Sequence, residues 1–166
     1  MSATITPTSA PQGKHARVLA STMLLSEWMA LFRPNTIHLW NLRLGPTVQN
    51  VQGQPLTPAI EAMLRRFNLY ADCVSVGASE IEVIECKVVA EPSAISQVET
   101  YTSLAPATPE LKAYPGRAFV PVLLFATDSD IVRQKAIAAG IRYFIYSPSW
   151  IGEYLATKYY RTGRAS

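Results

Sequence analysis

Two short apolar stretches in the middle of the chain predict a pair of strands joined by a tight turn. Tyr70 to Val76 and Ile81 to Val89 are mostly apolar, and the polar segment Gly77 to Glu80 separates them. This pattern is typical of a β-hairpin. Side chains alternate across a strand, and both faces of the second stretch are largely apolar. The pattern therefore predicts a hairpin that is covered on both sides.

Apolar periodicity predicts the other elements. We expect helices over Ala16 to Phe32, Ala59 to Phe67, Ala94 to Leu104, a segment capped by Thr127-Asp128-Ser129 and ending at Ala139, and Trp150 to Tyr160. We expect further strands over Thr36 to Leu44, Ala118 to Ala126 and Ile141 to Tyr146. The strand, helix, strand order near the C-terminus indicates a right-handed βαβ crossover. Together they predict an α/β fold, a mixed central β-sheet flanked by helices on both faces.

The alternation within Thr36 to Leu44 also predicts which side chains face the core. One set of alternate positions is the more apolar, and it comprises His38, Trp40, Leu42 and Leu44. We expect this set to point inward. His38 is then interpreted as a packed or hydrogen-bonded histidine before a catalytic one.

Composition favours one domain with a large core. The chain has 166 residues, of which 49% are hydrophobic and only 16% charged. We divide it into a flexible Ser/Thr/Pro-rich arm over residues 1–15 and a single domain over 16–166. The net charge of +3 is compatible with DNA binding but is too small to argue for it alone. No apolar run approaches membrane-spanning length and no signal-peptide pattern opens the chain, so we expect neither membrane association nor secretion.

Three charged residues interrupt the apolar hairpin, where burial makes charge costly: Asp72, Glu85 and Lys87. If the turn is Gly77 to Glu80, Asp72 falls opposite Glu85, with the Cβ atoms roughly 5 Å apart. Two carboxylates at that distance repel each other unless a cation lies between them. Mg²⁺ suits the position because it prefers oxygen ligands from one or two carboxylates and retains several waters. Lys87 could orient an attacking water or stabilise negative charge on a phosphate.

The spacing of Asp72 and Glu85-x-Lys87, followed by Gln97-x-x-x-Tyr101 on the next helix, resembles the PD-(D/E)XK nuclease superfamily, in particular its RecB-type members. The resemblance departs at one position, since Ala71 stands where the motif has proline. It implies a restriction-endonuclease-like core and a site in which Asp72 and Glu85 bind Mg²⁺ or Mn²⁺. Lys87 would assist the attacking water, and Gln97 and Tyr101 would complete the site.

Each of these assignments has an alternative in which the residue has only a structural role. Glu85-x-Lys87 is also what a solvated strand face carries, and Tyr101 at helical spacing is also what a core carries. Many members of the superfamily use an acid on the first helix as an extra metal ligand or water contact, and Glu27 is the candidate for it. The alternative for Glu27 is an exposed helix glutamate.

The resemblance implies a Mg²⁺-dependent nuclease that hydrolyses phosphodiester bonds in DNA. The alternative is a phage virion, head-completion or other assembly protein that uses a nuclease-like fold with weak, partner-activated or no catalysis. DNA is the expected partner, joined by other virion subunits in the second case, and a homo-oligomer is left open. The expected location is the cytoplasm, or the virion for a phage protein. Exposed aromatic side chains in the last helix would favour assembly, whereas buried ones would be core: Trp150, Tyr154, Tyr159 and Tyr160.

Overall fold

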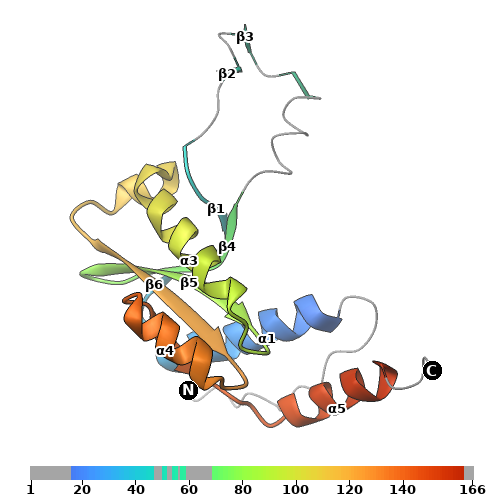
Figure 1. Cartoon of the computed structure of the whole chain (residues 1–166). Coiled ribbons are helices and arrows are strands. Elements are labelled where there is room, and N and C mark those ends of the chain that lie inside the picture. The colour runs from blue at the N-terminus through green and yellow to red at the C-terminus, as the bar shows by residue number, and fades with distance from the viewer. Residues whose placement is uncertain (1–15, 47–49, 52–53, 56, 59–68, 163–166) are drawn as a thin grey trace, which may run out of the picture.

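The structure is a computed structural model and describes residues 16–46, 50–51, 54–55, 57–58 and 69–162 (Figure 1). The predicted helix over Ala59 to Phe67 and the predicted arm over residues 1–15 lie outside the described residues. Within the described part, the fold class is the predicted one, an α/β fold with a mixed sheet.

A five-stranded sheet forms the centre of the molecule, in the order β1-β4-β5-β6-β7 (Figure 1). Its strands are β1 (Ile37–Arg43), β4 (Tyr70–Val76), β5 (Glu80–Lys87), β6 (Ala118–Phe125) and β7 (Arg142–Ile145). The pairs β1–β4 and β4–β5 are antiparallel, whereas β5–β6 and β6–β7 are parallel. A separate two-stranded ribbon pairs β2 (Asn50–Val51) with β3 (Gln54–Pro55). The central β4–β5 hairpin and the mixed character of the sheet are therefore confirmed.

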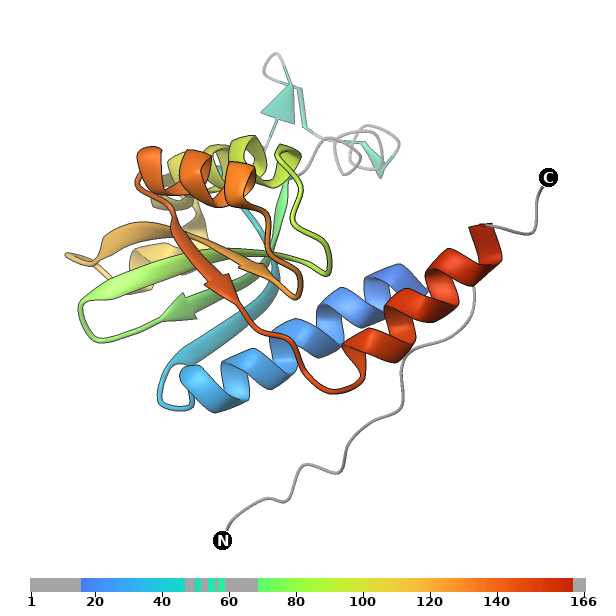
Figure 2. The same ribbon diagram turned by 60° about the horizontal axis from the view of Figure 1, so that its bottom comes forward.

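Helices cover both faces of the sheet (Figure 2). The described helices are α1 (Ala16–Phe32), α3 (Ser93–Leu104), α4 (Asp130–Ala138) and α5 (Ile151–Thr162), with 3₁₀ turns η1 (Ala105–Ala107) and η2 (Pro109–Ala113). α1 and α5 pack on the face that carries Ile84, Cys86 and Val122. α3 and α4 pack on the opposite face. None of the described helices has the length and apolarity that crossing a bilayer requires.

The last helix lies beside α1, and its first turns belong to the core (Figure 2). Trp150 and Tyr154 are each 5% exposed and belong to the same core cluster as Leu24 and Trp28 of α1. These two aromatic residues are thus core, and they do not form the exposed strip that would have favoured an assembly role. The side chains of Tyr159 and Tyr160 lie outside the described part of the chain.

The alternation predicted for β1 is wrong in its first half, whereas Leu42 and Leu44 pack in the core as predicted. Asn41 has a φ of +49°, in the left-handed region that non-glycine residues seldom adopt. This conformation interrupts the alternation, so that Leu39 before it and Leu42 after it both pack against the cluster under α3. Trp40, which was expected to point inward, is 44% exposed. His38 matches its expected structural role, because its Nε2 lies 2.9 Å from the carbonyl oxygen of Arg33.

Ion pairs stabilise the end of β5 that lies next to the hairpin turn. The buried carboxylate of Glu82 accepts two hydrogen bonds from Arg33, at 2.6 and 2.9 Å, and a third from Arg142 at 3.1 Å. Arg142 also pairs with Glu80. The guanidinium of Arg33 lies 4.7 Å from the ring centroid of Trp28, a cation–π distance. These contacts join the end of α1 to β5 and β7, and the candidate site lies at the other end of β5.

Candidate active site

The register of the hairpin is the one predicted from side-chain parity. Val76 pairs with Ile81, and the ladder runs back to the pair of Cys73 with Ile84. Beyond that pair the backbone ladder stops. There, an Oδ atom of Asp72 accepts a hydrogen bond from the backbone N–H of Cys86 at 2.8 Å. A side chain thus continues the pairing and holds the carboxylate of Asp72 between the ends of β4 and β5.

Glu85 is buried at this place with an incomplete set of partners. The residue is 3% exposed, and its Oε1 accepts a hydrogen bond from Lys87 Nζ at 2.8 Å. Its Oε2 is buried and has no hydrogen-bond partner among the described residues. Burial first, and the negative charge of Asp72 second, raise the pKa of Glu85 to about 7. A buried carboxylate oxygen without a hydrogen-bond partner is uncommon in native structures.

Asp72 shares the environment of Glu85. Burial raises the pKa of the Asp72 carboxyl, against the opposing effects of the Cys86 hydrogen bond and the charge of Lys87. Both acids are therefore harder to ionise than ordinary carboxyls. An added cation would favour the ionised form of both.

Lys87 is the positive member of the group. Burial acts to lower its pKa, but the hydrogen bond to Glu85 and the charges of Glu85, Glu91 and Asp72 outweigh burial and raise it. Its ammonium also lies 3.7 Å from a carboxylate oxygen of Glu91. Lys87 is consequently a hydrogen-bond donor and a positive charge at neutral pH, not a base.

Gln97 and Tyr101 lie together on α3, which packs on the face of the sheet that carries Ile81 and Val83. The Gln97 Nε2 donates a hydrogen bond to the hydroxyl of Tyr101 at 2.7 Å. Tyr101 is 5% exposed and belongs to the core cluster, so its ring is a core side chain, as the structural alternative expected. Its hydroxyl nevertheless interacts electrostatically with the two acids. Burial raises the pKa of Tyr101, and the negative charges of Glu85 and Asp72 raise it further.

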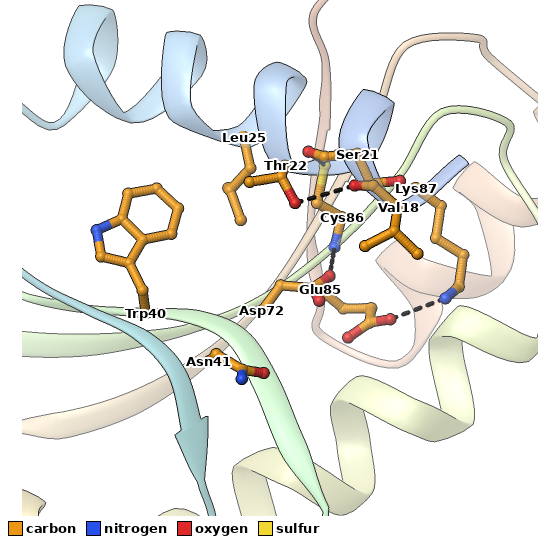
Figure 3. A pocket seen from close by; sticks show the side chains of 10 residues that line it. All are labelled: Val18, Ser21, Thr22, Leu25, Trp40, Asn41, Asp72, Glu85, Cys86 and Lys87. Carbon is orange, nitrogen blue, oxygen red and sulfur yellow. Dashed lines mark hydrogen bonds and ion pairs between the residues drawn. The ribbon is translucent and has the colours of Figure 1, made fainter. Parts of the chain in front are cut away.

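A pocket of about 530 Å³ opens over the acid pair (Figure 3). Its lining comprises Val18, Ser21, Thr22, Leu25, Trp40, Asn41, Asp72, Glu85, Cys86 and Lys87. The pocket thus combines the predicted acids and lysine with about two turns of α1 and the middle of β1. The α1 and β1 residues are absent from the site predicted from the sequence. No short motif signals them, because the tertiary packing of α1 and β1 brings them to the acid pair.

The structure does not bring Glu27 to this pocket. One carboxylate oxygen of Glu27 accepts a hydrogen bond from Trp150 Nε1 at 2.8 Å, and the other lies 3.3 Å from the hydroxyl of Tyr146. Both oxygens are used in joining α1 to the C-terminal part of the chain. The position assigns Glu27 a structural role and gives no support to it as an extra metal ligand.

The residues present fit a hard divalent cation. The donors are carboxylate oxygens, which Mg²⁺ and Mn²⁺ prefer, and one of them is the orphaned Oε2 of Glu85. Within the described ranges, no cluster of three or more His, Cys, Asp or Glu side chains is placed to hold a metal. The pair would thus supply two ligands and leave the remaining positions to water and substrate, as is usual for Mg²⁺.

Comparison with known proteins gives no further assignment. No family model, no curated protein and no solved structure matches this chain. The resemblance to the PD-(D/E)XK superfamily accordingly rests on the residues of the candidate site and their spacing.

Proposed function

We propose that this protein is a Mg²⁺-dependent nuclease that hydrolyses phosphodiester bonds in DNA. The observation that carries the proposal is the Oε2 of Glu85, a buried carboxylate oxygen without a partner, in a pocket that it shares with Asp72 and Lys87. Burying two carboxylates side by side costs free energy that the fold does not recover from its own contacts. A cation held between them would offset that cost.

Asp72 and Glu85 would hold the metal, which when bound neutralises charge on the scissile phosphate and lowers the pKa of a bound water. Asp72 is fixed for this task by its hydrogen bond to the Cys86 N–H. Glu85 is fixed by Lys87 through one oxygen and leaves the other oxygen for the metal. Both acids lie on strands at the centre of the sheet, so their positions are set before a substrate arrives.

Lys87 would act as a donor. Its ammonium can hydrogen-bond to the attacking water or to a phosphate oxygen and so stabilise the negative charge that develops there. The raised pKa of Lys87 argues against removal of the proton from water by its amine. The bond between Gln97 and Tyr101 fixes two polar groups of α3 near the acids, where they would position Lys87 or the water.

A cleavage assay tests the proposal. Linear and closed-circular DNA are incubated with the purified protein in Mg²⁺ or Mn²⁺, with EDTA as the metal-free control. We expect metal-dependent cutting, and loss of at least 100-fold in rate for Lys87→Ala, which is the scale on which a charge-stabilising donor acts. Lys135→Ala is the matched control, since Lys135 is an exposed lysine of α4 outside the pocket.

The circular substrate separates two modes of action, because cutting of it shows that no DNA end is needed. Failure to cut either substrate with either metal would overturn the nuclease proposal. Equal activity of Lys87→Ala and wild type would overturn the role given to Lys87. Circular dichroism of each variant establishes that a lost activity is not a lost fold.

A further inference from the structure

The pocket is larger and more varied than a cation site needs. Its volume of about 530 Å³ lies within the range of roughly 300–1,000 Å³ that small organic ligands occupy. The acids and Lys87 form one part of its lining. The remainder is apolar and hydroxyl-bearing, with Leu25 and Val18 beside Ser21 and Thr22. An occupant of the whole pocket must therefore carry both an anionic group and an apolar one.

Trp40 is the prominent feature of the second part. Its indole rises from β1 beside Leu25, on the far side of the pocket from Lys87 (Figure 3). Trp40 is 44% exposed, whereas the other two tryptophans of the chain, Trp28 and Trp150, are 2% and 5% exposed. The Trp40 ring meets the His38 ring edge-on, with the centroids 6.0 Å apart, and its accessible part is suited to stacking.

The backbone directs Asn41 to the same pocket. Consecutive residues of a regular strand point to opposite faces, yet Trp40 and Asn41 both line this pocket. The left-handed conformation of Asn41 makes this possible. Asn41 lies between the Trp40–Cys73 and Leu42–Ala71 pairs, so it is opposite Asp72. An amide that can both donate and accept hydrogen bonds thus lines the pocket at the strand position opposite Asp72.

We infer that the pocket binds an unpaired nucleotide next to the scissile phosphate, with its base stacked on Trp40, and that the substrate is single-stranded DNA. This inference rests on the proposed function. A base within a duplex is stacked on both sides and offers no face to Trp40, whereas an unpaired base does. The amide of Asn41 and the hydroxyls of Ser21 and Thr22 match the hydrogen-bonding groups of the base edge and the sugar.

Charge supports the same substrate. Lys87 is the only cationic side chain among the described residues that line the pocket, and it is already paired with Glu85. Extended contacts to the two phosphate backbones of a duplex need several lysines and arginines. Binding at this pocket must instead draw on stacking, which contributes to the affinity for single strands without sequence preference.

Intrinsic fluorescence tests the inference without requiring cleavage. Wild-type protein is titrated with a ten-residue oligothymidylate and with a blunt-ended duplex, in Ca²⁺ as an oxygen-ligated cation. Because Trp28 and Trp150 are buried, a stacked base should quench mainly Trp40. We expect quenching by the single strand and little by the duplex.

Anisotropy of a labelled oligothymidylate measures the affinity of the variants. We expect Trp40→Ala to weaken binding about 5- to 150-fold, the factor that loss of one stacked base produces. Trp40→Phe retains an aromatic ring and should lose less. Ile37→Ala is the control, since Ile37 is an exposed apolar residue of the same strand that does not line the pocket, and it should bind as wild type does.

Equal binding of the duplex and the single strand, or wild-type affinity in Trp40→Ala, would overturn the inference. Cleavage in Mg²⁺ is measured in parallel to separate it from the proposed function. Metal-dependent cutting of duplex and single strand alike, without quenching, would reject the stacked nucleotide and keep the nuclease. Quenching that depends on Trp40 in a protein that cuts nothing would reject the nuclease and leave a single-strand-binding pocket.

Discussion

Glu85 is where the demands of folding and of the candidate chemistry differ most. A carboxylate that is 3% exposed, with one oxygen unpartnered and a second acid nearby, destabilises the folded chain. An apolar residue would suit the interior of β5 better, as Ile81 and Val83 of the same face indicate. A role in binding a cation would explain why a glutamate stands at this position. The destabilisation that its buried carboxylate causes should be measurable in the metal-free protein.

The pH dependence of stability measures that cost. The pKa of Glu85 is about 7 in the folded chain, above its ordinary value of 4.5. Between these values the folded state holds a proton that the unfolded state has lost, so the free energy of unfolding falls as pH rises through this window. In EDTA we expect Glu85→Gln to remove a decline on the order of 3 kcal/mol between pH 4.5 and 8.

Urea unfolding at several pH values, for wild type and Glu85→Gln, gives the comparison directly. The difference between the two pH curves reports the ionisation of Glu85 together with its effect on Asp72, because the two acids interact. Parallel curves would show that Glu85 ionises as an ordinary surface glutamate does.

Substitutions of Asp72 separate its charge from its hydrogen bond. Asparagine retains an oxygen that can accept from the Cys86 N–H while removing the charge whose burial raises the pKa of Asp72. Asp72→Asn should therefore raise the melting temperature in EDTA and reduce the stabilisation that Mg²⁺ gives. Asp72→Ala should lower stability by about 1–3 kcal/mol, because it leaves a buried N–H unsatisfied. Scanning fluorimetry with and without Mg²⁺ distinguishes these results, and identical melting of all three proteins would refute the arrangement.

At the scale of elements, the β4–β5 hairpin was predictable because its determinants are local. The turn at Gly77 to Glu80 fixes the register, and the period of two then brings Asp72 and Glu85 together. Strand β1 was predictable in place but not in orientation. The left-handed φ of Asn41 interrupts the alternation, and an asparagine at a strand position does not by itself predict it. Trp40 was expected in the core and is found at the pocket, 44% exposed.

The ion-pair network around Glu82 gives a prediction at this scale. Arg33 makes two of the three hydrogen bonds to the buried carboxylate and is itself largely covered, whereas Arg142 is 42% exposed and makes one. Arg33→Ala should cost about 3–5 kcal/mol, since it leaves Glu82 buried with one weaker partner. Arg142→Ala should cost about 1 kcal/mol or less. Chemical denaturation ranks the two variants, and a larger loss in Arg142→Ala would contradict the network as described.

At the scale of the whole molecule, hydrophobic periodicity predicted the layers of helices and strands. It did not predict the contacts between segments that are distant in the sequence. The helices Ala16–Phe32 and Ser93–Leu104 end within one residue of their expected bounds, and the strands alternate with them as the α/β pattern requires. Glu27 illustrates the other case. Its partners, Trp150 and Tyr146, lie more than a hundred positions away, so its role could not be inferred from neighbouring sequence.

Glu27 thus offers a test that separates structure from activity. Glu27→Ala removes the acceptor shared by Trp150 and Tyr146, and we expect a loss of about 1–3 kcal/mol in the free energy of unfolding. The metal dependence of cleavage should be unchanged for the folded protein, because Glu27 does not line the pocket. Glu153→Ala, at an exposed position of α5, is the matched control and should alter stability by no more than about 0.5 kcal/mol.

The hydrogen bond between the Cys86 N–H and the Asp72 carboxylate makes one amide of the sheet unlike the others. Amides inside a backbone ladder exchange their protons with deuterated solvent only when strands separate. The Cys86 amide is protected by a side chain, so rotation about the bonds of Asp72 is enough to release it while the strands stay paired. Its deuterium uptake consequently follows the motion of a single carboxylate, and a ligand that draws Asp72 away from β5 would be seen at this amide before any change in the surrounding sheet.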